Sequence, residues 1–115
     1  MAAKDQNFEL WAGDDARPEI VIKDQEGNEV NLTDAGVEWV AVDQSDGTEM
    51  LRKDTDGGGI AITDPENGRC IIKIDGSDTD AMEDATLNHE ARVTLQDGSK
   101  VHVTVGTITL HSSNI

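Results

Sequence analysis

Hydrophobic residues recur at every second position along much of this chain, in short runs that are separated by turn-forming residues. Apolar side chains alternate in this way in residues 19–23, 37–42, 69–74 and 100–110. A period of two places successive side chains on opposite faces of a β-strand. About eight such runs, with turn signals every 8–12 residues, predict an antiparallel sandwich or barrel rather than a helical fold.

The alternation also assigns one face of each expected strand to the core. The residues expected to face inward are Ile20, Ile22, Val37, Trp39, Ala41, Cys70, Ile72, Ile74, Val101, Val103, Val105, Ile108 and Leu110. Gly106 breaks the alternation within the last expected strand. A glycine at such a phase break indicates a β-bulge.

Residues 75–84 lack the alternation and are expected to form a short helical crossover. Ser77 or Asp78 can cap this helix, because a side-chain oxygen accepts hydrogen bonds from the first backbone N–H groups of a helix. The chain has 115 residues, with no internal repeat and no long linker. We therefore expect a single domain over residues 1–115, whose core spans about residues 8–110 between short terminal arms.

The formal net charge is −15, from 24 acidic and 9 basic residues. This charge repels phosphate backbones and anionic lipids, so neither a nucleic acid nor a membrane is expected as a partner. It also destabilises a compact chain unless salt screens the repulsion, and at ~1 M salt the Debye length is only about 3 Å. The acids are spread over every segment, which favours a halophilic host over an ordinary acidic protein or a single acidic binding patch.

Cys70 is the only cysteine, so no intrachain disulfide can form. It stands next to isoleucines and is expected to be a small buried residue rather than a reactive thiol. No apolar stretch approaches the length of a transmembrane helix. The first seven residues lack the apolar core of a signal peptide, so synthesis and assembly are expected in the cytoplasm.

Polar residues form no complete catalytic or metal-binding pattern. His89 and His102 lie on the two arms of the last expected hairpin and could face each other, but without a third ligand we favour cross-strand pairing over a metal site. Asp54 and Asp56 resemble the start of a calcium loop and are the candidate metal ligands, although Pro65 stands where an EF-hand needs Glu. No nucleophile motif accompanies the carboxylates, so we expect neither an enzyme nor a cofactor.

The most distinctive segment, residues 24–36, is expected to turn, return briefly and turn again. Gly27-Asn28 is expected to supply the two positive-φ positions of the first turn. The residues expected to enter the core from a short returning strand, or to close the second turn, are Val30, Leu32, Thr33 and Asp34. Alone, this pattern predicts only a β-turn with a short return.

Four such turn motifs follow one another in an order that resembles a known family. They occupy residues 13–33, 59–68, 78–82 and 91–110. Together they resemble the immunoglobulin-like domain of phage baseplate upper proteins, which opens with a strand, an Asp-x-Asp/Glu-Gly turn and a Val-x-Leu-Thr return. The resemblance covers nearly the whole chain and departs at residues 82–89, where the family often has a Pro/Gly turn and an aromatic-rich strand.

The resemblance implies an immunoglobulin-like β-sandwich that serves as a structural protein of a tailed virus particle, in the tail, the baseplate or the capsid surface. The implied partners are other virion structural proteins, in a symmetric homo- or hetero-oligomer, and no catalytic residues are carried over. The residues we expect at a docking surface are Trp11, Val40, Val42 and Ile71. Val40, Val42 and Ile71 fit equally well in a sandwich that is apolar on both faces of its sheets.

Two other functions remain open at this point. The first is a carbohydrate- or cation-binding β-sandwich module, in which Trp11 is the only plausible residue for stacking on a sugar. The second is a cellular immunoglobulin-like protein of a halophile. Binding modules usually combine exposed aromatic residues with a convergent set of ligands, and this chain has only two Trp, one Phe and no Tyr.

Overall fold

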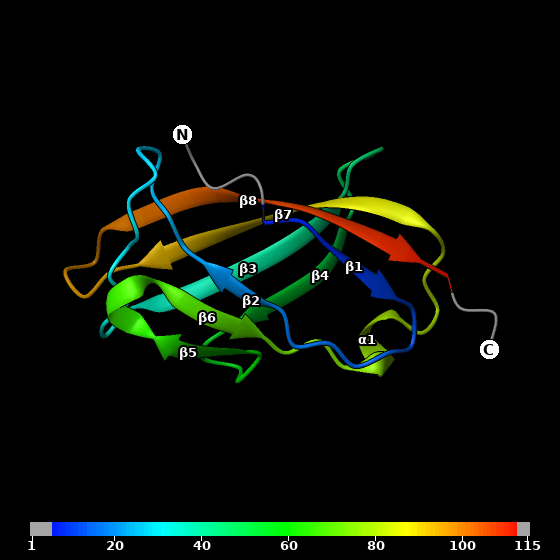
Figure 1. Cartoon of the computed structure of the whole chain (residues 1–115), viewed down its shortest axis with the longest axis horizontal. Coiled ribbons are helices and arrows are strands. Elements are labelled where there is room, and N and C mark those ends of the chain that lie inside the picture. The colour runs from blue at the N-terminus through cyan, green and yellow to red at the C-terminus, as the bar shows by residue number, and fades with distance from the viewer. Residues whose placement is uncertain (1–5, 113–115) are drawn as a thin grey trace.

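The chain folds into two stacked β-sheets in a computed structural model that describes residues 6–112. Within these residues, eight strands, one 3₁₀ helix and one short α-helix follow one another along the chain (Figure 1). Their bounds are β1 Phe8–Trp11, β2 Glu19–Val21, β3 Gly36–Asp43, β4 Glu49–Asp54, β5 Ile60–Asp64, η1 Pro65–Asn67, β6 Arg69–Ile72, α1 Gly76–Thr79, β7 Ala85–Thr94 and β8 Lys100–His111. The larger sheet has the order β1-β8-β7-β3-β4, and the smaller sheet has the order β2-β6-β5.

This strand order is that of an immunoglobulin domain. In the larger sheet, β8, β7, β3 and β4 take the places of strands G, F, C and C′, and β2, β6 and β5 take the places of B, E and D in the facing sheet. The expected immunoglobulin-like β-sandwich is therefore confirmed. The expectation of a wholly antiparallel sandwich is wrong for one pair, because β1 runs parallel to β8, with Phe8 opposite Ile108. A tight hairpin forces its two strands to run antiparallel, and no hairpin joins β1 to β8.

The inner faces of the two sheets form one hydrophobic core. Every residue that the alternation assigned to the core is buried except Val101, which is half-buried. Trp39 on β3 is the largest fully buried side chain. Cys70 also lies in this core, where burial raises the pKa of its thiol to about 12 and keeps it protonated at neutral pH.

The segment over residues 24–36 turns twice, but its details differ from the expectation. Gly27 has a positive φ of 86°, whereas Asn28 does not; instead, the Asp24 carboxylate accepts hydrogen bonds from the N–H groups of Glu26 and Asn28. This Asx turn replaces the second left-handed residue. The return is a single bridge between Lys23 and Glu29 rather than a strand.

The second half of this segment docks on the smaller sheet. Leu32 is buried and its N–H donates to the Pro65 carbonyl oxygen at 2.7 Å, while Val30 is half-buried. Asp34, with φ of 57°, closes the second turn. It is the only non-glycine residue with positive φ among residues 6–112. The segment therefore covers one end of the sandwich.

The short helix and the bulge lie where the sequence indicated. The cap is different: Asp75 is the N-cap residue of α1, and Asp78 lies inside the helix. Ser77 and Asp78 were assigned wrongly because the helix begins two residues earlier than expected. The bulge is confirmed, since the β7–β8 register shifts where His89 pairs with Gly106 and Glu90 with Thr104. No helix within residues 6–112 has the length and apolarity that a membrane crossing requires.

Candidate functional site

The larger sheet has one face that no other described segment covers. Val37, Trp39 and Ala41 point inward from β3, so Glu38 and Val40 between them point outward. We call the outward side of β1, β8, β7, β3 and β4 the outer face. Its outward side chains include those of Trp11, Glu38, Val40, Val42, Arg52, Glu90, Arg92 and His102.

A shallow hollow of about 140 Å³ lies on the outer face where β3, β4, β7 and β8 run side by side. It is lined by Glu38, Val40, Arg52, Glu90, Ala91, Arg92 and His102. Val40 supplies an apolar side chain, and the charged side chains of the lining surround it. Protein–protein interfaces are enriched in arginine and depleted in glutamate, so Val40 and the arginines are the part of this lining that resembles an interface.

Ion pairs hold several of the charged side chains around the hollow. Arg52 donates to Glu49 Oε1 at 2.7 Å and to Glu38 Oε2 at 3.2 Å, and His102 Nε2 lies 3.1 Å from Glu90 Oε2. The hydrogen bond from Arg52 lowers the pKa of Glu49. These side chains are about half exposed, so the pairs position the charges more than they stabilise the fold.

Arg92 is the exception in this cluster. It stands directly opposite Glu38 on β3 and opposite His102 on β8. Its guanidinium group makes no ion pair with any residue from 6 to 112. A guanidinium that projects from a sheet without an internal carboxylate partner is available to a ligand or another protein.

The residues expected at a docking surface do not form one patch. Val40 and Val42 lie together on the outer face and are half-buried. Trp11 lies on β1, at the edge of the same sheet, and its side chain is the only exposed large hydrophobic group among the described residues, at 49% exposure. Ile71 projects from β6 of the smaller sheet, on the opposite side of the sandwich. Val40 and Val42 therefore share a surface with the hollow, and Trp11 lies at the edge of that surface.

The exposed indole of Trp11 is already partly covered by a neighbouring side chain. His111, its partner on β8, stacks on it with ring centroids 4.6 Å apart and planes 25° apart. His111 Nε2 in turn lies 3.0 Å from Glu9 Oε1. One indole face therefore remains for stacking on a ligand.

Of the candidate metal ligands, Asp54 is the last residue of β4 and Asp56 lies in the loop that follows. The Asp54 carboxylate accepts the N–H of Gly57, so it shapes the loop. Asp56 is exposed. Among residues 6–112, no group of three or more His, Cys, Asp or Glu side chains is placed to hold a metal ion.

The expectation that His89 and His102 face each other is wrong. The turn of the last hairpin pairs Arg92 with His102, which leaves His89 opposite Gly106 and on the inner side. There His89 Nδ1 accepts the indole N–H of Trp39 at 3.0 Å, and Nε2 lies 2.9 Å from the carbonyl oxygen of Gln6. An indole N–H can only donate, so Nδ1 carries no proton and Nε2–H donates to Gln6.

We expect this buried imidazole to make the fold sensitive to mild acid. Burial lowers the pKa of His89 below its usual 6.5, whereas the unfolded chain binds a proton near that value. The unfolded state then holds more protons, so the free energy of unfolding should fall as the pH drops from about 6.5 through the lowered pKa. Urea titrations between about pH 7.5 and 5 measure this decrease.

His89→Gln is the matching variant, because an amide can keep both hydrogen bonds and does not titrate. It should show a smaller decrease over the same pH range, and the exposed control His102→Gln should keep the decrease of the unmodified protein. An equal decrease in His89→Gln would show that other groups cause the acid sensitivity.

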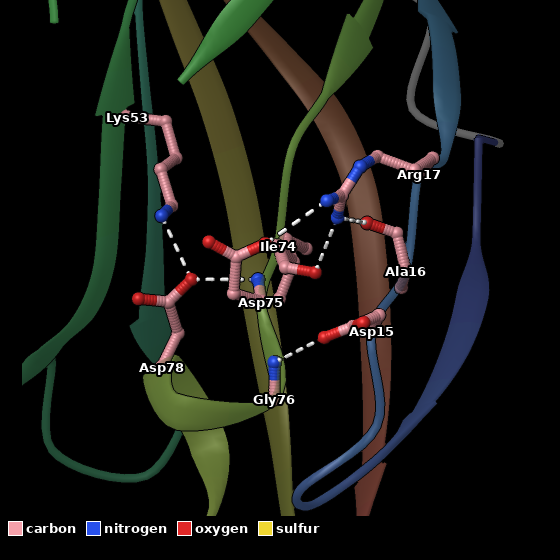
Figure 2. Close-up of polar contacts among 8 residues, drawn as sticks. All are labelled: Asp15, Ala16, Arg17, Lys53, Ile74, Asp75, Gly76 and Asp78. Atoms are coloured by element: carbon pink, nitrogen blue, oxygen red, sulfur yellow. Dashed lines mark hydrogen bonds and ion pairs between the residues drawn. The ribbon is translucent and has the colours of Figure 1, made fainter. Parts of the chain in front are cut away.

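A second polar cluster ties α1 to both sheets (Figure 2). Lys53 of β4 donates to Asp78 Oδ2 at 2.7 Å, and the same oxygen accepts the N–H of Asp75 at 2.8 Å. Arg17, just before β2, donates to Asp75 Oδ1 at 2.9 Å and to the Ile74 carbonyl oxygen at 2.7 Å. Sequence reasoning missed the Lys53–Asp78 pair, because it depends on where α1 meets β4.

We expect Asp78→Ala to lower the free energy of unfolding by about 1–2 kcal/mol, because it removes a helix-start acceptor and the partner of a mostly buried lysine. The hydrogen bond from Lys53 lowers the pKa of Asp78. The Asp78 carboxylate therefore stabilises the fold fully above 3.8, the carboxyl pKa of the unfolded chain. This stabilisation is lost as the pH falls through the lowered pKa of Asp78 in the folded state. Urea denaturation at pH 7 and pH 2.5 should show the difference from the unmodified protein shrinking in acid. Asp80→Ala, exposed at the end of the same helix, is the control and should change stability by less than about 0.5 kcal/mol.

Comparisons with known proteins add little to this picture. No described protein family matches the sequence, and no curated protein matches it. Among solved structures, murine CRIg is similar over 99% of this chain and 98% of that chain, with 14% sequence identity and a TM-score of 0.43. A similarity of this level supports no statement about function, and the strand order given above defines the fold independently of it.

Proposed function

We propose that this chain is a non-enzymatic structural protein of a tailed virus particle, in which the outer face of the larger sheet docks onto other virion proteins. The observation that carries the proposal is the uncovered outer face itself, where Val40 and Val42 adjoin arginine–glutamate pairs and a shallow hollow. The resemblance of the turn motifs to phage baseplate domains supports the viral setting. The high acidic charge supports a host that lives in concentrated salt.

The outer face suits a protein partner better than a small molecule. Its hollow is shallow and charged, whereas small-molecule sites are deep and mostly apolar. The half-buried valines of this sheet surface offer a moderate apolar area to a partner. The charges around them favour one partner and one orientation of that partner. These are the properties needed to place one module at a fixed angle on another.

Particle incorporation tests this function. Particles of the virus that encodes the chain are purified through a density gradient and analysed by mass spectrometry and cryo-EM. We expect the chain in the particle fraction at a fixed copy number, with density for a two-sheet module on the tail, baseplate or capsid. Absence of the chain from intact particles would overturn the proposal.

A pair of surface variants tests the docking face within that function. Val40→Asp changes the outer face, and Ile71→Asp makes the same chemical change at a half-buried position on the opposite sheet. We expect Val40→Asp to lose incorporation and Ile71→Asp to retain it, with both variants folded by circular dichroism. Retention of Val40→Asp, or loss of Ile71→Asp alone, would assign docking to another surface.

A further inference from the structure

We propose that Asn31 is an N-glycosylation site, at which a glycosyltransferase of the cell that makes the chain attaches a neutral sugar to the side-chain amide nitrogen. The site lies in the distinctive segment over residues 24–36, which the docking role of the outer face does not use. A sugar at Asn31 is therefore independent of that role, and either can be absent without the other.

Three residues of this segment form a glycosylation motif. Asn31-Leu32-Thr33 matches Asn-x-Ser/Thr, the sequence at which asparagine side chains accept sugars, and the excluded proline is absent from its middle position. Among the asparagines that are followed by at least two residues, only Asn31 has Ser or Thr at the second of them. Because so short a motif also arises by chance, its place in the fold decides whether it can be modified.

The fold presents both polar side chains of the motif to solvent. Asn31 and Thr33 are exposed, whereas Leu32 between them is buried. The N–H of Leu32 donates to the Pro65 carbonyl oxygen at 2.7 Å, which anchors the loop. Figure 1 shows the loop at the end of the sandwich that is remote from α1. A bulky glycan on the outward side of this anchored loop requires no change in the core.

The amide of Asn31 is turned so that its nitrogen is available. Its Oδ1 accepts the backbone N–H of Thr33 at 2.9 Å, which closes an Asx turn. Within residues 6–112, neither Nδ2 of Asn31 nor the hydroxyl of Thr33 makes a hydrogen bond. The reacting nitrogen and the hydroxyl that the motif requires are therefore both open to a transferase.

A second hollow gives the first sugar a surface to rest on. This open hollow of about 690 Å³ is lined by Asn31 and Thr33 together with Leu95, Gln96 and Asp97 of the turn between β7 and β8. Leu95 is half-buried and can contact the apolar face of a sugar ring. Gln96 and Asp97 are exposed and can hydrogen-bond to sugar hydroxyls.

The charges around the motif favour a neutral sugar over an acidic one. Asp34 follows the motif directly, and Asp97 lies in the lining of the hollow. Asp97 Oδ1 accepts the N–H of Ser99 at 2.9 Å, which leaves Oδ2 to accept from a sugar hydroxyl. Among the described residues, the hollow is lined by neither lysine nor arginine. A sugar carboxylate or sulfate would therefore meet like charges without a basic partner.

Attachment is a glycosyl transfer from a sugar diphosphate whose other end is either a nucleoside or a lipid. Nδ2 of Asn31 forms a bond to C1 of the sugar while the bond between C1 and the phosphate oxygen breaks. The phosphate leaves with the electron pair of that bond, and Nδ2 gives one proton to a base of the transferase. The transfer oxidises and reduces nothing, so it needs no further reactant.

Mass spectrometry of the chain purified from the cells that naturally produce it tests the site. Trypsin cleaves after Lys23 and Arg52, so Asn31 lies in one peptide over residues 24–52. We expect this peptide to carry the mass of a neutral sugar, and fragmentation to place that mass on Asn31. A peptide that carries no sugar would overturn the inference.

Variants made in the same cells test whether the motif is read. Asn31→Gln and Thr33→Val should lose the sugar completely, because the first displaces the acceptor nitrogen and the second removes only the required hydroxyl. Thr33→Ser keeps the hydroxyl and should retain the sugar, as should the control Asn28→Gln, which lies in the same peptide outside any motif. A sugar that persists in Thr33→Val would contradict the assignment. The readout is a peptide mass, so it holds even for a variant that folds poorly.

An inhibitor that sequesters lipid diphosphates distinguishes the two donors. Loss of the sugar in treated cells assigns the lipid-linked donor. Persistence of the sugar assigns the nucleotide-linked donor, which acts in the cytoplasm. Both outcomes keep Asn31 as the acceptor.

Discussion

Trp39→Ala is expected to lower the free energy of unfolding by about 4 kcal/mol, a large part of the total stability of a small domain. The indole is completely buried at the centre of the sandwich and comes from β3, the strand between β7 and β4. Its loss leaves a cavity, which the two sheets could close only by moving closer together and disturbing the packing of the other core residues. Urea denaturation followed by circular dichroism measures the change.

Trp39→Phe separates the polar part of this effect from the loss of volume. Phenylalanine keeps an aromatic ring but leaves Nδ1 of the buried His89 without its donor. An unsatisfied buried acceptor costs about 1–3 kcal/mol, in addition to the smaller cavity. The control is Trp11→Phe, the same change at the exposed tryptophan, which should cost less than about 0.5 kcal/mol. Equal losses at the two positions would contradict the assignment of Trp39 as the buried anchor.

The core was the part of this fold most open to prediction, because burial on a β-sheet follows a period of two. Val37, Trp39 and Ala41 illustrate this, since each is buried as the alternation requires. The same reasoning identified Val40 as outward but could not decide whether a second layer covers it. That decision depends on which strands form the other sheet, and Ile71 proved to lie on the far side of the sandwich.

Features that depend on register or on cap geometry were predicted less well. The prediction that His89 and His102 face each other was wrong, because the turn of a hairpin fixes which residues of its two strands pair. The observed turn places the two rings on opposite faces of the sheet. The prediction of a positive φ at Asn28 was wrong, because the side chain of Asp24 closes the turn in place of a second left-handed residue. The residue that caps a helix is an equally local feature, and the N-cap residue of α1 is Asp75 rather than Ser77 or Asp78.

The candidate docking site shows the same limit more strongly. The sequence alone identifies Glu38 and Arg92 as charged residues in two different strands. Their juxtaposition requires β3 and β7 to be neighbours in one particular register, which only the folded sheet defines. The lone guanidinium of Arg92 was therefore invisible to sequence patterns, although its alternation with buried Ala91 and Val93 marks it as outward.

Gly68→Ala is expected to be nearly as destabilising as the loss of Trp39, by on the order of 3 kcal/mol. Gly68 ends η1 with φ of 70°, a left-handed conformation that costs other residues about 1 kcal/mol. A Cβ at this position would also lie 2.7 Å from the carbonyl oxygen of Ile22 and 2.9 Å from that of Val30. Both obstacles are backbone atoms, so they cannot rotate away as a flexible side chain would.

The same position explains how the segment over residues 24–36 is held in place. The N–H of Ile22 donates to the carbonyl oxygen of Gly68 at 2.8 Å, and the N–H of Val30 donates to that of Ile22 at 2.9 Å. An added methyl group would separate these three backbone segments and release the docked segment. We therefore expect the Gly68→Ala variant to lose protection from hydrogen exchange at Ile22, Val30 and Leu32 before the larger sheet is affected.

Gly98→Ala provides the control for Gly68→Ala. Gly98 has φ of 88°, and a Cβ there would meet nothing within 4 Å. Its replacement should therefore cost only the conformational preference, about 1 kcal/mol. The difference between the two variants in urea denaturation measures the steric part alone. If Gly98→Ala destabilises the fold as much as Gly68→Ala does, then the crowding by Ile22 and Val30 is relieved in solution and the segment is not anchored at Gly68.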